Sequence, residues 1–323
     1  MKKGRMSWFV KIIIVIAVFF VFTGITAFFF KGQGMVPMVP KAGQGSILAL
    51  DLKGMIIDKS KFLKNLRQHS QNEKIKGVLI RLDSPGGSVA LSQEIYHEFK
   101  KIRADLKKPV VISAGSMMTS GGLYVAAGAS FVFVNPGTLS GSIGVIVPLM
   151  NMERLYDWAK VEPYSIKTGE FKDTGTRFRP MTSRERVLFQ DLINELLEQF
   201  KSAIIEGRNM TMEDLEPYTD ARVFTGEVAV SAGFADSIGT YSDAVEKIGE
   251  LSGLGKKPKL FTPQPTYFDL LSGRVNSRVL NALIDKGADI STSFLEEKKI
   301  LFSILGFHFG VRPLYIFPPA IGM

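Results

Sequence analysis

The sequence predicts an α/β fold with a mostly parallel sheet and flanking helices. The first observation is alternation, because short apolar runs typical of buried strands are separated by segments with helical spacing. These runs lie at 47–52, 76–82, 109–114 and 130–134. The second observation is that glycine-bearing loops follow strands at 83–87, 120–122 and 140–144. Since the carboxyl ends of parallel strands share one edge of a sheet, these loops are expected to lie together and form a site.

Local sequence patterns predict the helices. A polar segment at 60–69 carries apolar residues one helical turn apart, and residues 125–129 are small and helix-compatible. Thr182 and Glu185 form a capping box that opens a long helix, which Gly207 is expected to end. Two apolar stripes mark the longer helices: Val89, Leu91, Ile95, Phe99 and Ile102, and then Phe189, Leu192, Leu196, Phe200 and Ile204.

Composition excludes several classes of chemistry. The 323 residues contain no cysteine, which excludes disulfides, thiolate catalysis and cysteine-ligated metals. With three histidines, His69, His97 and His308, the chain offers little for a histidine-rich metal site. The net charge is +9, but no nucleic-acid-binding motif accompanies it. We therefore predict no metal, no cofactor and no nucleic-acid partner.

The chain divides into five parts. Residues 1–11 are basic, 12–30 are apolar and uncharged, and 31–45 form a linker rich in glycine and proline. A folded domain is predicted over 46–254, and an apolar, proline-containing tail of unknown role over 255–323. The tail is a candidate to pack on a neighbouring subunit, on the membrane surface or in the chain's own substrate groove.

The apolar segment 12–30 is long enough to cross a bilayer. Basic residues precede it, so the N-terminus is expected in the cytoplasm and the folded domain outside it, with anionic lipid as a partner of the basic residues. A cleaved signal peptide is the alternative. The length of the run and the bulky Phe28-Phe29-Phe30 favour an uncleaved anchor.

Ser120 is the candidate nucleophile. It stands between the predicted strand 109–114 and a helix, and Gly121-Gly122 follow it directly. A serine there lies at a helix N-terminus, and an N–H of Gly121 and one from Gly86-Gly87 could face an oxyanion. The alternative is an N-cap serine in a glycine-rich turn.

A serine nucleophile needs a base, and no histidine lies in a glycine-rich loop. A lysine can serve if burial or a nearby cation lowers its pKa towards neutrality. Lys172 follows a strand-like segment and Gly169. Its alternative role is that of a solvated loop lysine.

Four motifs, taken in order, resemble the signal peptide peptidase A family in its short, single-domain bacterial form. The resemblance covers roughly residues 46–250. The motifs are Asp83-Ser84-Pro85-Gly86-Gly87, Thr119-Ser120-Gly121-Gly122-Leu123-Tyr124, Leu139-Ser140-Gly141-Ser142-Ile143-Gly144-Val145 and Lys167-Thr168-Gly169-Glu170-Phe171-Lys172-Asp173. The chain departs from the family in Met117-Met118-Thr119, where small residues are usual, and in Ala221, where glycine is usual.

The resemblance implies a fold like those of Clp protease and crotonase, and a Ser/Lys-dyad endopeptidase without cofactor. By motif position Ser120 is the nucleophile, Lys172 the general base and Ser142 the residue that orients the lysine. Gly86 and Gly121 are the implied oxyanion donors.

The resemblance also implies a setting and a partner. It places the chain in the bacterial inner membrane as a single-pass protein, with its catalytic domain in the periplasm. Remnant signal peptides and other small or unfolded apolar polypeptides are the implied substrates. A ring-like homo-oligomer, in which neighbouring subunits supply the serine and the lysine of one site, is the implied assembly. Two rival functions remain: a crotonase-like acyl-CoA enzyme and a non-catalytic membrane scaffold.

Overall fold

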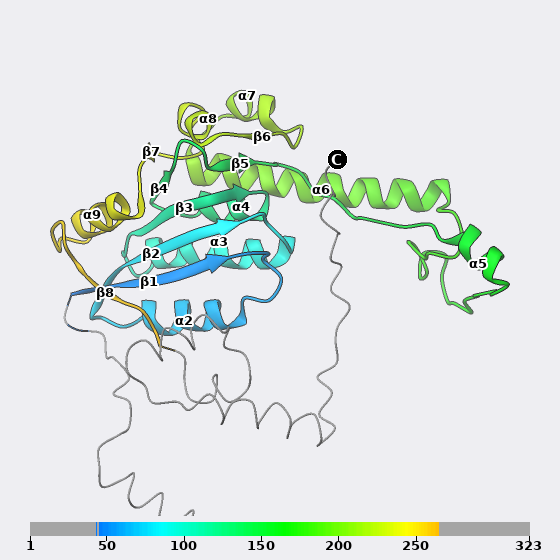
Figure 1. Ribbon diagram of the computed structural model, residues 1–323, viewed down its shortest axis with the longest axis horizontal. Helices are drawn as coiled ribbons and strands as arrows, with labels where there is room; N and C mark the ends of the chain where they lie inside the picture. The colour runs from blue at the N-terminus through cyan, green and yellow to red at the C-terminus, as the bar shows by residue number, and fades with distance from the viewer. Residues whose placement is uncertain (1–42, 44, 265–323) are drawn as a thin grey trace, which may run out of the picture. The chain divides into compact units, whose positions relative to one another are not determined.

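A single twisted sheet organises the molecule (Figure 1). The computed structural model describes residues 43 and 45–264. The strands are β1 (Ser46–Lys53), β2 (Ile75–Ser84), β3 (Val110–Thr119), β4 (Phe131–Val134), β5 (Leu139–Gly141), β6 (Val223–Phe224), β7 (Ser237–Ile238) and β8 (Lys259–Phe261). Their order is β6-β5-β3-β2-β1-β8, with β4 beside β3 and β7 beside β4. Only the β5–β6 pair is antiparallel among these strands, which confirms the predicted α/β class.

Helices cover both faces of this sheet (Figure 1). They are α2 (Ser60–Ser70), α3 (Val89–Ala104), α4 (Gly121–Ala127), α5 (Glu153–Ala159), α6 (Ser183–Arg208), α7 (Met212–Leu215), α8 (Gly226–Ser231) and α9 (Tyr241–Leu251), with a short 3₁₀ turn at Glu216–Tyr218. Alternate strand residues separate two cores. Leu48, Val78 and Ile112 share the larger core with α2, α3, α4 and α6, whereas Ile47 and Leu79 meet Ile248 of α9.

The long helix α6 ends differently from the prediction. It runs to Arg208, and Asn209 ends it with a left-handed φ of 52°. Gly207 has another role, because a Cβ at this position would lie 2.1 Å from the carbonyl oxygen of Ala127. Glycine there lets α6 pack closely against the end of α4. The capping box is confirmed: the Glu185 N–H donates to Thr182 Oγ1 at 3.2 Å, and the Thr182 N–H donates to Glu185 Oε2 at 2.8 Å.

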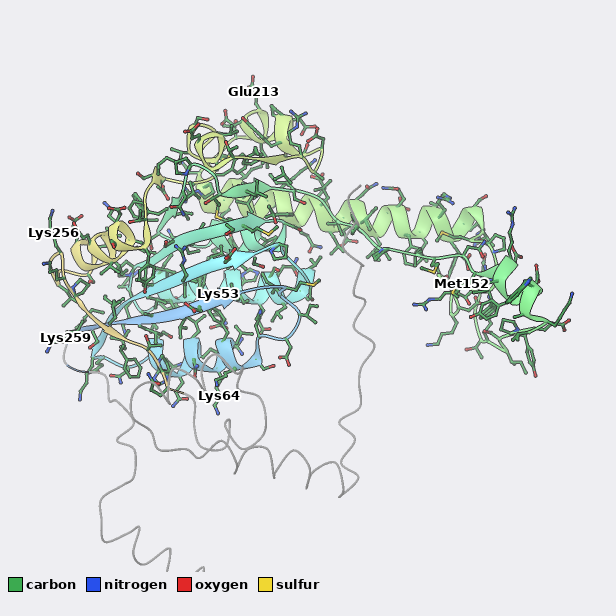
Figure 2. The ribbon with its side chains drawn as sticks, viewed as in Figure 1. Lys53, Lys64, Met152, Glu213, Lys256 and Lys259 are labelled. Atoms are coloured by element: carbon green, nitrogen blue, oxygen red, sulfur yellow. The ribbon has the colours of Figure 1, made fainter. Side chains whose placement is uncertain are left out.

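The first half of α6 projects beyond the sheet together with α5 (Figure 1). We call residues 145–192 the arm. Figure 2 labels Met152, which immediately precedes α5, at the far end of the arm. The second half of α6 is anchored in the core through Phe200, Ala203 and Ile204. A solvent-exposed arm of this kind was not predicted from the sequence.

Strand β8 lies within the segment that composition assigned to the tail, and it pairs with β1 from Ser46↔Lys259 to Leu48↔Phe261. The sheet therefore continues past residue 254. No helix in the described part of the chain is long and apolar enough to cross a membrane. The predicted span at 12–30 and most of the predicted tail lie outside the described residues.

Candidate active site

Ser120 sits at the carboxyl end of β3 in a strained backbone conformation. Its φ is 51° and its ψ is −121°, a region that residues other than glycine rarely occupy. Its N–H donates to Gly141 O at 2.8 Å, and its carbonyl accepts from the Tyr124 N–H at 3.0 Å. Its side chain makes no capping hydrogen bond, which leaves the simple N-cap role without support. The hydrogen bonds with Gly141 and Tyr124 hold this strained conformation.

The loop after β2 presses directly on this serine. A Cβ on Gly86 would lie 2.8 Å from Gly121 N and 3.1 Å from Ser120 Oγ, and the φ of Gly86 is 102°. Asp83 links the ends of β2 and β3, because its Oδ1 accepts the Met117 N–H at 3.0 Å. The sheet edge therefore brings these glycine loops together, as predicted.

The backbone N–H groups beside Ser120 differ in whether they already donate a hydrogen bond. The Gly86 N–H already donates to Ser84 Oγ at 3.1 Å. The Gly87 and Gly121 N–H groups have no acceptor among the described residues. Gly87 N lies 3.3 Å from where a Cβ of Gly121 would stand, so these two amides are neighbours. Within the Gly86-Gly87 pair, the geometry favours Gly87 as the donor to an oxyanion.

The third loop completes the serine side of the site. Strand β5 pairs with the end of β3, and Thr119 stands opposite Gly141. Ser142 follows Gly141 directly, with a left-handed φ of 55° and its N–H bonded to Arg222 O at 2.7 Å. Ser142 is half-buried, and it lies in the loop whose Gly141 carbonyl accepts the Ser120 N–H.

A small hollow of about 20 Å³ opens beside Ser120. Its lining side chains are mainly apolar and include Val89, Val145, Leu196 and Phe200. A larger hollow of about 840 Å³ lies between α2 and α3, and Ser120 does not line it. The small apolar hollow suits a small side chain of a bound peptide next to the serine.

Lys172 lies elsewhere in the chain. It occupies an exposed turn in the segment between α5 and α6, on the arm (Figure 1). Within the described residues its ammonium group makes no hydrogen bond or ion pair, and it does not contact Ser120. The structure therefore unites Ser120, Gly86, Gly121 and the Ser142 loop, but it does not bring Lys172 to them within one chain.

A charged network fixes the turn that carries Lys172. Arg179 Nη2 contacts Asp173 Oδ1 at 2.9 Å and Glu185 Oε1 at 2.6 Å, and Lys167 Nζ also pairs with Asp173. Hydrogen bonds from Arg179 and Thr182 lower the pKa of Glu185 to about 2. A hydrogen bond from Lys167, then one from Arg179, lowers the pKa of Asp173. Sequence reasoning found the Thr182–Glu185 box but missed this network, because nothing in the sequence pairs Arg179 with its partners.

Comparison with known proteins points to one peptidase family. The profile of peptidase family S49 matches residues 102–255, which include Ser120, Ser142 and Lys172. A protein of Enterococcus faecium that bears the name signal peptide peptidase SppA is 27% identical over 313 residues, covering 91% of this chain and 88% of its own length. Residues 102–255 therefore carry a peptidase family S49 domain. The resemblance to signal peptide peptidase A drawn from the four motifs is thereby confirmed.

Two further relatives of this S49 chain are named as proteases. One, from Synechocystis sp., is 39% identical over 184 residues, 57% of this chain and 66% of the relative. The other, from Methanocaldococcus jannaschii, is 31% identical over 193 residues, 60% of this chain and 61% of the relative. The matches therefore span less than two thirds of these two relatives. Among solved structures, a variant of the membrane-bound stomatin-specific protease 1510-N has a TM-score of 0.44 and 17% identity, covering 69% of this chain and 100% of that one.

Proposed function

We propose that this S49 chain is a membrane-anchored serine endopeptidase that uses Ser120 as nucleophile and Lys172 as general base. The observation that carries the proposal is the setting of Ser120. Its backbone is strained, its side chain makes no capping hydrogen bond, and the glycine loops pack closely around it. The N–H groups of Gly87 and Gly121 in these loops have no acceptor among the described residues. Preorganised donors beside a nucleophile are what a developing oxyanion requires.

The proposed reaction proceeds in two steps. Ser120 Oγ attacks the carbonyl carbon of a peptide bond while its proton passes to the neutral amine of Lys172. The C–N bond then breaks, the leaving amine takes the proton, and an ester of Ser120 remains. Water hydrolyses this ester with Lys172 as base, releasing the acid product and restoring the serine.

A neighbouring subunit must supply Lys172 in this mechanism. The arm that carries it exposes large apolar side chains, with Ile146 81%, Trp158 80%, Tyr164 83% and Ile166 95% exposed. So much exposed apolar surface on one segment is typical of a protein–protein interface. We propose a ring-like homo-oligomer in which each arm places Lys172 beside Ser120 of the next subunit, with Ser142 orienting the lysine.

The proposed substrates are remnant signal peptides and other small or unfolded apolar polypeptides. The small apolar hollow at Ser120 and the relative named SppA support this class. The apolar segment 12–30 would hold the catalytic domain at the outer surface of a bacterial inner membrane, where such peptides arise.

The test uses the full chain in detergent, a fluorophosphonate probe and an apolar fluorogenic peptide. The parent should be labelled and should cleave the peptide. Ser120→Ala should lose the label, and both Ser120→Ala and Lys172→Ala should lose roughly 10³-fold or more in kcat/KM. Lys53→Ala, which removes an exposed lysine at the end of β1, should stay at the parent level. An unlabelled but assembled parent would support a scaffold, and acyl-CoA turnover without peptide cleavage would support the crotonase-like rival.

A further inference from the structure

Basic side chains gather at the end of the sheet where its parallel strands begin. We call the following residues the basic end: Lys74, Lys76, Arg103, Lys107, Lys108, Lys247, Lys256, Lys257 and Lys259. Figure 2 labels Lys256 and Lys259 at this end, beside the start of β1. The parallel registers place the segments that carry the others there too, because Ser46 pairs with Ile75 and with Lys259, and Val111 pairs with Phe131.

Acidic side chains balance this charge only in part. Four acidic residues lie on the same segments: Glu73, Asp105, Glu246 and Glu250. Glu246 is 3.6 Å from Lys256. Two neighbouring pairs, Lys100 with Glu206 and Arg208 with Asp236, cancel within themselves. The basic end therefore keeps a clear positive excess, nine basic side chains against four acidic ones.

Exposed leucines accompany the lysines. Leu106, Leu251 and Leu260 are 37%, 45% and 41% exposed, on the loop before β3, at the end of α9 and in β8. Of these three leucines, Leu251 lines a groove of about 710 Å³, together with Lys107 and Lys247. Basic side chains interleaved with apolar ones are the composition of surfaces that bind the headgroup region of anionic bilayers.

The chain also enters the sheet at this end. Ser46 is the first residue of β1, and the 15 residues 31–45 separate it from the apolar segment 12–30. A glycine-rich linker of that length has a root-mean-square span of roughly 20 Å. An anchored chain would thus hold the beginning of β1, and the basic end around it, close to the bilayer.

The opposite end of the sheet has no comparable charge. Where β1 ends, Lys53 Nζ lies 2.6 Å from Asp51 Oδ2. Asp58 and Lys59, which follow in the chain, are neighbours of opposite charge. Ser120 lies at this opposite end, one strand of ten residues away from the start of β3, which is roughly 30 Å. The two ends of the sheet therefore differ in both charge and function.

We propose that the basic end lies on the headgroups of anionic phospholipids and sets the orientation of the catalytic domain on the membrane. The proposal rests on the anchor in the proposed function, and it adds that the domain is oriented by its own surface. Ser120 is then held a strand's length away from the bilayer surface. Salt should weaken the contact, because exposed charges are screened.

The experiment uses the full chain in lipid nanodiscs that carry a nitroxide on the headgroup. Because the chain has no cysteine, single cysteines can be labelled with a fluorophore at either end. Gln71→Cys lies beside Asn72, whose carbonyl accepts from Lys108 Nζ at 2.9 Å, and Met55→Cys lies at the opposite end, where Met55 is 54% exposed. In discs of phosphatidylglycerol and phosphatidylcholine, quenching should be several-fold stronger at Gln71→Cys than at Met55→Cys. High salt, or discs of phosphatidylcholine alone, should remove the difference.

Two matched charge reversals complete the test. Lys257→Glu with Lys259→Glu should lower the quenched population at Gln71→Cys by roughly fivefold or more per lysine. Lys53→Glu with Lys64→Glu changes the net charge by the same amount and should have no effect. Equal quenching at both labels in chains embedded in the discs would contradict the proposed contact between the basic end and the headgroups. It would not contradict the membrane anchor. If the chain does not enter the discs, the anchor fails; the labels are then read with anionic vesicles, where no quenching at Gln71→Cys would also overturn the basic end.

Discussion

Ser120 keeps its strained, positive-φ backbone because hydrogen bonds hold both its N–H and its carbonyl. The Gly141 carbonyl fixes its N–H, and the Tyr124 N–H fixes its carbonyl. Strain of this kind costs about 1–3 kcal/mol and persists where the surroundings over-determine it. The same packing explains Gly86, whose missing side chain makes room for Ser120 and for the Gly121 amide.

Gly86→Ala should therefore abolish most activity. The new Cβ would stand 2.8 Å from Gly121 N and 3.1 Å from Ser120 Oγ, so the nucleophile and the oxyanion donor must both move. We expect kcat/KM to fall by about 10²-fold or more, since a displaced oxyanion donor alone costs that much. Gly137→Ala is the matched control, because a Cβ there meets nothing within 4 Å. Equal peptide turnover by the two variants would contradict this account of Gly86.

Ala221 offers a stability prediction at the residue scale. It has a left-handed φ of 64°, and its Cβ is 2.8 Å from where a Cβ on Gly144 would stand. Relief of the left-handed strain gains about 1–2 kcal/mol, and the added chain freedom of glycine costs about 0.4–1 kcal/mol. Ala221→Gly should therefore raise the free energy of unfolding by about 0.5–1 kcal/mol, measured by thermal denaturation. A lower melting temperature than that of the parent would count against it.

At the scale of elements, some features of α6 and the arm could be predicted from the sequence and others could not. The Thr182–Glu185 capping box and the apolar stripe of α6 were predicted, because both are local patterns. The end of α6 was misplaced, because Gly207 is a glycine for close packing on Ala127 and not for a cap. The exposure of the arm was not predictable, since an apolar residue facing a partner has the same pattern as one facing the core.

The network around Arg179 should control where Lys172 points. Arg179→Gln removes both ion pairs to Asp173 and Glu185 and frees the turn between them. We expect faster amide hydrogen exchange over residues 170–182 and a lower kcat with little change in KM, because the lysine is misplaced while the pocket is intact. Arg186→Gln is the control, since Arg186 is exposed on α6 and makes no ion pair among the described residues. Unchanged exchange and kcat in Arg179→Gln would remove the positioning role.

The same network predicts a direction with pH. The folded pKa of Glu185, about 2, lies below its ordinary value of 4.5. The stabilisation that ionised Glu185 gives the folded turn is therefore complete above pH 4.5. It is lost as the pH falls through about 2. Without Arg179 the pKa of Glu185 should rise, and protection of the turn should already be lost at a higher pH. Hydrogen exchange of residues 170–182 against pH measures this shift, and identical profiles for the parent and Arg179→Gln would contradict it.

At the scale of the whole molecule, one chain does not bring the two residues of the proposed dyad together. Parallel-sheet logic predicted that the glycine loops meet at one edge, and they do, with Ser120 among them. The sequence also singled out Lys172, but no pattern within one chain could show that the lysine lies on an arm away from that edge. In the proposed oligomer the exposed apolar side chains of the arm, such as Trp158 and Ile166, would decide which subunit the arm reaches.

The most direct measurement mixes two inactive variants of the full chain. Ser120→Ala keeps Lys172, and Lys172→Ala keeps Ser120, so an oligomer assembled from both contains some interfaces with an intact serine and an intact lysine. Each variant alone should be nearly inactive on the apolar peptide. After dissociation and reassembly together, a substantial fraction of parent activity should return, up to about a quarter for an equal random mixture that pairs each serine with one neighbouring lysine. No recovery in mixed oligomers of confirmed composition would contradict a serine–lysine site shared between subunits.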